Sequence, residues 1–322
     1  MNISNFFKRK KIGATMMALS LMLGGCDVLY DDLDSCDTYL KFKYDYNMLY
    51  ADAFNNQVDK VEVFFFGKDG KYICSMSEEG EVLKSSGYRM KLPADLWGTT
   101  AVTWAGHHDS YNLVPLVAGE STTSDLLLKM KRNENSMRNE RLEPLWNGTP
   151  ISISSKVGEV QEVGLVRNTN NIRIVLKNVE DADTPVPASD IQFKVTADNG
   201  FYNHDNSLHK DDVITYLPHY ISGDTRDGVT AEISIMRLMA DKNVRLSIYN
   251  KADNTYLFGG AESINLINYF LMTKMEEYNM SSQEYLDRQY DWNLTFFYTS
   301  GSFVAVQIVI NGWTVWTAGV DM

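Results

Sequence analysis

The sequence has few cysteines, few histidines and none of the short motifs that mark common active sites. It contains three cysteines and five histidines among 322 residues. No histidine has HExxH spacing or a cysteine beside it in a zinc-binding pattern, and the Gly-x-Ser-x-Gly and phosphate-binding glycine motifs do not occur. These absences argue against metal-dependent, serine-nucleophile and nucleotide-dependent catalysis. We expect no enzyme activity and no cofactor.

Positive charge is also scarce. Lysine and arginine together number 30 against 42 acidic residues, which gives a net charge of −12. Residues 1–25 hold four of the basic residues and none of the acidic ones, so the chain without them has 26 basic residues, 42 acidic residues and a net charge of −16. Because such a surface repels phosphate groups, we expect no nucleic-acid partner.

The N-terminal segment has the three parts of an export signal. Basic residues 8–11 precede an uncharged stretch, residues 12–23, which is too short to cross a bilayer as a helix because that takes about 20 residues. Leu23-Gly24-Gly25-Cys26 follows and resembles the bacterial lipobox, in which the cysteine is lipidated and becomes the first residue. We predict a signal peptide over residues 1–25 and a lipid on Cys26. An ordinary cleaved signal with an incidental cysteine is the alternative.

Residues 26–37 are predicted to form a lipidated acidic tether. Five aspartates lie in this stretch, which is typical of a solvated leash and also resembles the surface-export signal of Bacteroidetes lipoproteins. More than one acyl chain makes membrane attachment stable, so we expect a surface-exposed, palmitate-bearing lipoprotein held in the outer membrane. Cys36 and Cys74 form an even pair outside the cytoplasm, and either a disulfide between them or two free thiols would fit.

The remaining chain has the alternation of β-strands. Large and polar residues alternate over residues 38–46, and residues 58–66 are followed by Gly67-Lys68-Asp69-Gly70, which favours a hairpin turn into residues 71–76. Turn residues recur about every ten positions, as in β-sandwiches. We place a domain boundary near Gly164, with an N-terminal β-sandwich over 38–164 and a C-terminal one over 165–322. Further strands are predicted at 99–105, 124–130, 151–154, 171–176, 190–196, 229–236, 244–249 and 303–318.

One region departs from the strand pattern. Apolar residues recur at helical spacing over residues 264–278, which predicts a short helical insertion in the second sandwich. Ser281 and Glu284 have the spacing of a capping box, so a second short helix is expected through Arg288.

Several segments together resemble the FimB-type fimbrial anchor lipoproteins of Bacteroidetes type V pili, and they occur in the expected order. They are YDYNM at 44–48 with ADAF at 51–54, VEVFFFGKDGKY at 61–72, WAG at 104–106, TADNGFY at 196–202 with DN at 205–206, MSSQEYLDRQ at 280–289 and INGW at 310–313.

The resemblance implies an all-β fold of two transthyretin-like β-sandwich domains in tandem and no enzyme activity. It implies a subunit at the base of the fimbrium that holds the filament to the outer membrane and terminates its elongation. The partner would be the major fimbrial subunit, the stalk pilin, joined by exchange of a C-terminal strand. For residues 303–310 we favour a core strand of the second domain, whereas residues 312–322 can leave their own sheet. The candidate strand-exchange residues are Gly312, Trp313, Val315 and Trp316.

The first predicted strand bears on the same function. Residues 38–46 contain no arginine, and none lies between Cys26 and that strand. Family members that form the stalk lose their first strand to an arginine-specific protease. We therefore expect that this subunit keeps its first strand and cannot accept a strand from another subunit.

Two other kinds of function stay open. A glycan-binding or adhesive surface lipoprotein, including a pilus tip adhesin, would stack sugar rings on exposed aromatic residues. Metal binding is a weaker alternative, through His107 and His108 or through the aspartates at 181, 183 and 190 or 198, 205, 211 and 212. The candidate aromatic residues are Tyr44, Tyr46, Trp97, Trp104, Tyr111 and Trp146.

Overall fold

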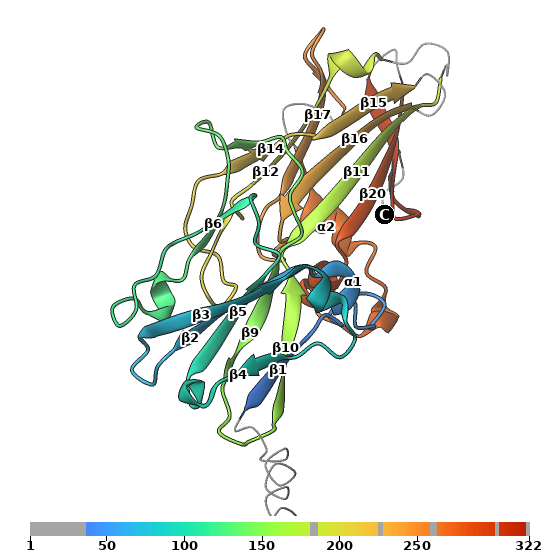
Figure 1. Cartoon of the computed structure of the whole chain (residues 1–322). Coiled ribbons are helices and arrows are strands. Elements are labelled where there is room, and N and C mark those ends of the chain that lie inside the picture. The colour runs from blue at the N-terminus through green and yellow to red at the C-terminus, as the bar shows by residue number, and fades with distance from the viewer. Residues whose placement is uncertain (1–36, 181–185, 225–227, 258–262, 300–302, 320–322) are drawn as a thin grey trace, which may run out of the picture.

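The computed structural model describes residues 37–180, 186–224, 228–257, 263–299 and 303–319. These residues form an elongated molecule of β-sheets with a few short helices (Figure 1). β1 (Thr38–Lys43) begins at one end of the long axis, and β15 (Tyr220–Asp224) lies near the other. Within the described part of the chain, no helix is long and apolar enough to cross a membrane.

The first half of the chain forms a seven-stranded sheet. Its strand order is β3-β2-β5-β9-β10-β1-β4, so β1 lies inside the sheet and β3 and β4 lie at its edges. The predicted strands at 38–46, 58–66, 71–76, 99–105 and 151–154 correspond to strands of this sheet. Their bounds are β2 Lys60–Phe66, β3 Tyr72–Glu79, β4 Met90–Leu92, β5 Thr100–Ala105, β9 Trp146–Ser152 and β10 Val160–Arg167.

The second part of β2 is buried on both faces, which explains its continuous apolar run Val63–Phe66. Val63 and Phe65 belong to the core of the first half, whereas Phe64 and Phe66 belong to a larger core that extends into the second half. A strand that faces two cores has no side for polar residues. The Asp-Gly turn into β3 forms as predicted: Gly70 adopts φ +76°, which suits glycine, and its N–H donates to the carbonyl of Gly67 at 2.9 Å.

The second half is a sandwich of two sheets. The first has the strand order β15-β16-β11-β20-β21-β22, and the second has the order β18-β17-β12-β14-β8, with β19 paired to β17. The bounds in the first sheet are β11 Thr169–Asn178, β16 Gly228–Met236, β20 Asp291–Thr299, β21 Val304–Ile310 and β22 Trp313–Thr317. Those in the second are β8 Met137–Arg138, β12 Ile191–Ala197, β14 Ile214–Tyr216, β17 Arg245–Asn250, β18 Thr255–Tyr256 and β19 Ile264–Asn265.

The two halves share strands. A small sheet of β6 (Tyr111–Leu113), β7 (Leu128–Met130) and β13 (Phe201–Tyr202) joins residues from both sides of Gly164, and β8 of the first half pairs with β14 of the second. The predicted boundary near Gly164 stays a prediction. Any experiment that separates the halves there has to break these pairings.

The helical region is shorter than the sequence predicts. Residues 264–278 form the two-residue strand β19, then α2 (Leu266–Leu271), and later the 3₁₀ turn η5 (Glu276–Tyr278). The predicted short helical insertion is present, but its α-helix covers only part of this range. Thr273 is buried, and its Oγ1 lies 2.7 Å from the carbonyl oxygen of Phe270 and 2.8 Å from the Tyr285 hydroxyl, so these bonds hold the chain in a turn where the apolar pattern would continue a helix.

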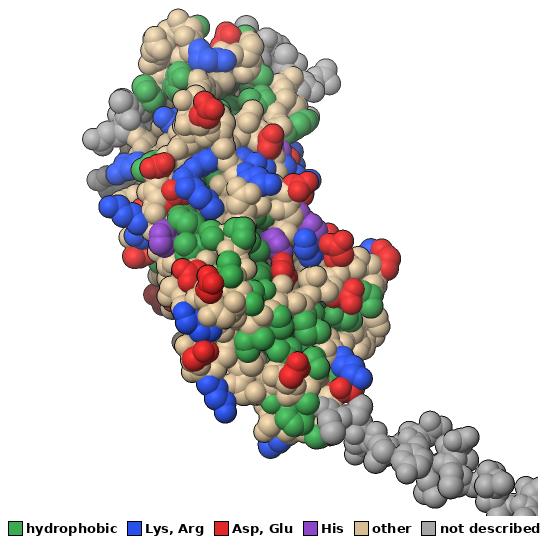
Figure 2. All heavy atoms as spheres, turned by 60° about the vertical axis from the view of Figure 1, so that its left-hand side comes forward, with side chains coloured by type: hydrophobic (Ala, Val, Ile, Leu, Met, Phe, Trp, Pro, Cys, Tyr) green, Lys and Arg blue, Asp and Glu red, His purple; other side chains and the backbone are tan. Residues whose placement is uncertain are grey.

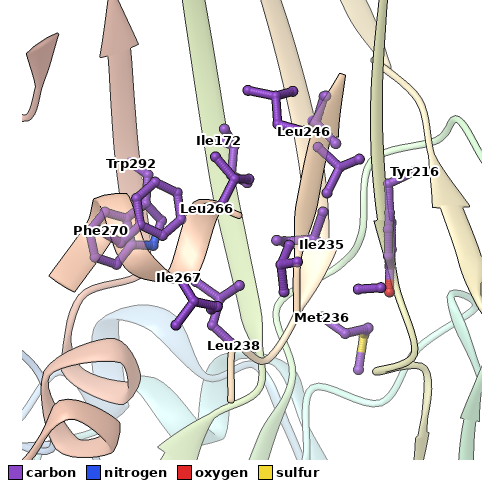
Figure 3. Packing of buried hydrophobic residues seen from close by; sticks show 14 of the residues in the cluster. Ile172, Tyr216, Ile235, Met236, Leu238, Leu246, Leu266, Ile267, Phe270 and Trp292 are labelled. Atoms are coloured by element: carbon purple, nitrogen blue, oxygen red, sulfur yellow. The ribbon is translucent and has the colours of Figure 1, made fainter. Parts of the chain in front are cut away.

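α2 nevertheless packs against the larger core, the one that extends into the second half. Leu266, Ile267 and Phe270 point toward the sheet residues, and the ring of Phe270 stacks on Trp292 with 3.9 Å between ring centres (Figure 3). The second helix, α3 (Ser282–Arg288), begins as predicted, because the Ser281 hydroxyl accepts the backbone N–H of Glu284 at 3.1 Å.

The other helical segments are single turns. They are α1 Phe54–Gln57 and the 3₁₀ turns η1 Gly80–Lys84, η2 Ala94–Leu96, η3 Thr123–Asp125 and η4 Ala188–Asp190.

Candidate functional site

The first strand is paired along both edges. β1 pairs in parallel with β10 over five positions, from Tyr39 opposite Val160 to Lys43 opposite Gly164, and in antiparallel fashion with β4. Its burial alternates as the sequence predicts, with Leu40 and Phe42 in the core of the first half. β1 is therefore an interior strand of its sheet, and its removal would open two edges and a strip of the core.

The chain is fastened where it enters β1. The Asp37 carboxylate lies 2.6 Å from Lys91 Nζ, and this hydrogen bond raises the pKa of Lys91. The Asp37 carbonyl accepts the N–H of Gly158 at 2.8 Å, and Trp97 Nε1 donates to the Thr38 hydroxyl at 2.6 Å. These three contacts hold the chain in place from Asp37, the first described residue, onward.

Two of the three cysteines lie outside the described residues. The structure therefore places neither Cys26, the predicted lipid site, nor Cys36, and both roles stay predictions. Cys74 lies on β3 and packs partly against the core of the first half. Burial raises the pKa of its thiol, which lowers its thiolate fraction at neutral pH.

The last strand lies at a sheet edge. β22 pairs with β21 through a hairpin whose turn is Asn311 and Gly312, both with positive φ (+48° and +87°). The register shifts next to Ile308, so the ladder contains a bulge. β22 is held by backbone pairing on one side only.

The four candidate strand-exchange residues have different surroundings. Gly312 forms the turn, Val315 is buried, Trp316 packs partly against the larger core, and Trp313 is 54% exposed. The structure thus places one of the two tryptophans largely in solvent. Their role in strand exchange stays a prediction.

Two arginines join the two halves at the waist, which is the region where residues 44–57 of the first half meet residues 288–291 of the second. The sequence patterns did not reveal these arginines. Arg167 is the buried last residue of β10, with its guanidinium 3.9 Å from the centre of the Tyr290 ring and Nη1 3.1 Å from the side-chain oxygen of Gln57. Arg288 at the end of α3 lies over the rings of Tyr46 and Tyr50, at 4.1 and 4.4 Å. Its Nη1 also donates to two carbonyls of the first half, those of residues 45 and 47.

Arg237 makes a further contact next to the waist, within the second half. It forms a two-pronged ion pair with Asp287, at 2.6 and 2.7 Å, and donates to the carbonyl of Asn206 at 3.2 Å. Burial alone would lower the pKa of Arg237, but Asp287 outweighs it and the pKa is raised. Asn206 in turn exchanges side-chain hydrogen bonds with Asn168, the residue between β10 and β11.

These contacts bring together segments that are distant in the sequence. Residues 44–54, 205–206 and 280–289, three of the stretches singled out above, all lie at or next to this waist. Beside them is a cavity of about 350 Å³ lined by residues 47–57 and 288–291. Residues 44–54 and 280–289, two of the stretches that carry the resemblance, therefore contact each other across the two halves.

The histidines and aspartates do not assemble a metal site in the described residues. His107 lies 3.2 Å from Glu62 and His108 lies 2.9 Å from Asp59, and no group of three or more potential ligands occurs there. The Asp211 carboxylate is taken up by Arg132 at 2.6 Å and by a lysine, which leaves it unsuited to calcium. Asp181 and Asp183 lie outside the described residues.

The proposal that six aromatic residues offer sugar-stacking faces is wrong for most of them. Tyr46 lies beneath Arg288, and Trp97 is half-buried, with its indole N–H bonded to Thr38. Figure 2 shows acidic and basic side chains spread over one face, with hydrophobic ones gathered around its middle and lower part. The four fully buried aromatic candidates are Tyr44, Trp104, Tyr111 and Trp146.

Comparison with known proteins decides the family. The family model of fimbrillin-A associated anchor proteins Mfa1 and Mfa2 matches residues 33–319. The chain belongs to this family. The Mfa2 family consists of fimbrial anchor and adhesin-like structural proteins and is not a family of enzymes, and the sequence resemblance to fimbrial anchor proteins is confirmed.

Individual relatives agree with the family match. The minor fimbrium anchoring subunit Mfa2 of Porphyromonas gingivalis is 23% identical over 317 residues, which cover 95% of this chain and 94% of that protein. Its solved structure has a TM-score of 0.68 at 19% identity and covers 87% of this chain and 99% of that one, which supports the fold.

A solved structure from Bacteroides thetaiotaomicron, provisionally described as a polysaccharide-binding protein, is 39% identical. Its TM-score is 0.79, and it covers 87% of this chain and 97% of that one. The predicted fold class, all-β with β-sandwich domains, is confirmed for this member of the Mfa2 family.

Proposed function

We propose that this chain is an exported lipoprotein that holds a fimbrium to the outer membrane and ends its elongation. Membership of the Mfa2 family over nearly the whole chain is the observation that carries this proposal. The lipid on Cys26 would supply the membrane attachment, and the acidic tether would separate the folded part from the lipid.

The paired first strand supports the role of terminator. A subunit can accept a strand only where its own sheet offers an open edge beside an apolar slot. β1 fills that place here, because β10 and β4 pair with both of its edges. The first arginine after Cys26 is Arg89, which follows β3, so an arginine-specific protease cannot separate β1 from β2 and β3.

The edge position of β22 supports the role of donor. A strand that is paired on one side and lies close to the C-terminus can leave its sheet without moving any other strand. In a neighbouring stalk pilin, its backbone would regain partners and its exposed Trp313 would become buried. The departure of β22 would leave one backbone edge of β21 without hydrogen-bond partners, which opposes donation.

Trp313 gives a direct test of strand donation. Because its side chain is 54% exposed, Trp313→Ala should leave the free energy of unfolding of the purified subunit nearly unchanged. Leu49→Ala is the matched control, since Leu49 is also highly exposed and lies at the waist. We expect longer, more easily shed fimbriae with Trp313→Ala and wild-type fimbriae with Leu49→Ala, measured by electron microscopy and by the fimbrial protein in the culture medium. Wild-type fimbriae in both variants would contradict donation through Trp313.

Lipidation is tested separately. Cys26→Ala should release the protein, with its fimbriae, from the outer-membrane fraction, and metabolic labelling with a palmitate analogue should label the wild type alone. Retention of unlabelled Cys26→Ala protein in that fraction would contradict the lipid anchor.

Glycan binding is the second candidate function. It is favoured by the 39% identical relative that is provisionally described as polysaccharide binding. Of the aromatic residues considered above, Trp97 is the more accessible tryptophan, at the entry to β1. Binding on a glycan array that is lost in Trp97→Ala would favour this function over the anchor.

A further inference from the structure

We propose that β1 and β10 form a mechanical clamp that is loaded in shear when the molecule is pulled. This inference rests on the proposed function, because an anchor has to carry tension between a lipid at its N-terminus and a filament bound to its second half. It concerns the strength of one strand pair, and it can be measured on the isolated protein.

The direction of the strands decides the geometry. β1 and β10 run in parallel, and both lead away from the end at which the chain enters β1 (Figure 1). β10 then continues into β11 after the single residue Asn168, so the two strands follow each other into the second sheet. Tension therefore pulls β1 at its N-terminal end and β10 at its C-terminal end.

Opposite pulls on these two ends act along the strands. The five residue pairs from Tyr39–Val160 to Lys43–Gly164 then bear the load together, because neither strand can slide unless their hydrogen bonds break at the same time. Had the first strand run antiparallel to β10, the same pull would have acted at one end of the ladder and opened it one pair at a time.

Side chains oppose the same sliding motion. Leu40 and Phe42 are buried in the core of the first half, so displacing β1 along its axis would drag both through a packed interior. Lys41 Nζ lies 3.0 Å from the Glu162 carboxylate across the pair. On the other edge, β4 adds three antiparallel residue pairs.

The entry to β1 protects the clamp from peeling. Peeling begins with fraying of the first residue, and here Asp37 is held by Lys91 and by the N–H of Gly158, while Trp97 holds Thr38. The second sheet repeats the geometry, because β11 and β20 are parallel over eight residue pairs, from Asn171–Asp291 to Asn178–Tyr298.

Single-molecule force spectroscopy on the unlipidated mature chain tests the clamp. All three native thiols are removed with Cys26→Ser, Cys36→Ser and Cys74→Ser, one handle is ligated to the N-terminus, and the other is attached to an introduced cysteine. Lys251→Cys, in the exposed turn before β18, gives shear. Val157→Cys, in the exposed turn beside Asp37, pulls β1 sideways and gives peeling.

We expect the rupture force of β1 to be several-fold higher with the handle at residue 251 than with the handle at residue 157. Chemical denaturation of both variants, with equal midpoints, shows that the two positions differ in geometry and not in stability. Equal or lower rupture force in the shear geometry would overturn the proposal. Such a result would leave the fimbrial phenotypes of Trp313→Ala and Cys26→Ala unaffected, so the clamp and the anchor function can fail independently.

Discussion

The first and last strands of the described chain are attached to their sheets in contrasting ways. β1 is an interior strand, paired on both edges and fastened at its entry by Lys91 and Trp97. β22 is an edge strand in a bulged hairpin, with Val315 as its one buried side chain. The difference separates a strand that the fold retains from a strand that the fold can release. It matches what an anchor that keeps one end and donates the other would require.

Truncating a buried side chain of β1 should have the largest effect. Phe42 is 2% exposed and stacks on Phe54 with 5.7 Å between ring centres, so Phe42→Ala leaves a cavity in the core of the first half. We expect a loss of about 4 kcal/mol in the free energy of unfolding, measured by urea denaturation. A loss below that of Val315→Ala would break the contrast between the two strands.

Removing the ion pair next to the waist tests how far it stabilises the second half. Asp287→Ala leaves the buried guanidinium of Arg237 without its carboxylate, and we expect a loss of about 3 kcal/mol. Hydrogen exchange should rise mainly in the second half, because both partners of the pair lie there. Glu284→Ala is the control, since its ion pair with Arg288 is more exposed and should cost under about 1 kcal/mol.

Truncation in β22 should cost less. Val315→Ala removes two buried methyl groups at a sheet edge, and we expect a loss of about 2 kcal/mol, with hydrogen exchange increased only in β21 and β22. Increased exchange throughout the second sheet would show that β22 is an integral strand and is not ready to leave.

Acid should destabilise the first half of the chain before it affects the β21–β22 hairpin. Burial, with smaller contributions from Lys60 and His108, lowers the pKa of His107 from 6.5 to about 4. The neutral form is thus favoured in the fold, and its stabilisation, present above pH 6.5, is lost as the pH falls toward 4. We expect a loss of about 1–2 kcal/mol by pH 5 that is absent in His107→Gln, measured by urea denaturation. An equal acid loss in both proteins would rule out His107.

The smallest effect is expected at the entry to β1. Trp97→Phe keeps a ring in place but removes the donor to the Thr38 hydroxyl, and the loss should be about 1 kcal/mol. Exchange of the amides at the start of β1 should increase, and that of β22 should not. A uniform increase would contradict a local role for Trp97.

Much of the fold could be predicted because local patterns determine it. Alternation located β1, runs of β-forming residues located β2 and β16, the Asp-Gly pair located the β2–β3 turn, and Ser281 located the start of α3. The length of the α2 helix could not be predicted, since the chain leaves the helix for the tertiary hydrogen bonds of Thr273.

Less of the site could be predicted, because its contacts also depend on tertiary structure. Arg167, Arg237 and Asp287 act through partners far away in the sequence, and no local periodicity marks a buried ion pair. The exposure of Trp313 depends on the edge position of β22, which follows from strand order. Strand order is a property of the whole chain, so the sequence could mark Trp313 as a candidate for strand exchange but could not show that its side chain is exposed while Val315 is buried.

The parallel pairing of β1 also has a consequence for the timing of folding. Lys41 and Glu162, which face each other across the β1–β10 pair, are 121 positions apart in the sequence. A chain that emerges N-terminus first presents β1 long before β10 exists, and such a distant contact is slow to form. The N-terminal end of the folded part would therefore wait unfolded for its partner, and any chaperone that guards this chain should be needed most in that interval.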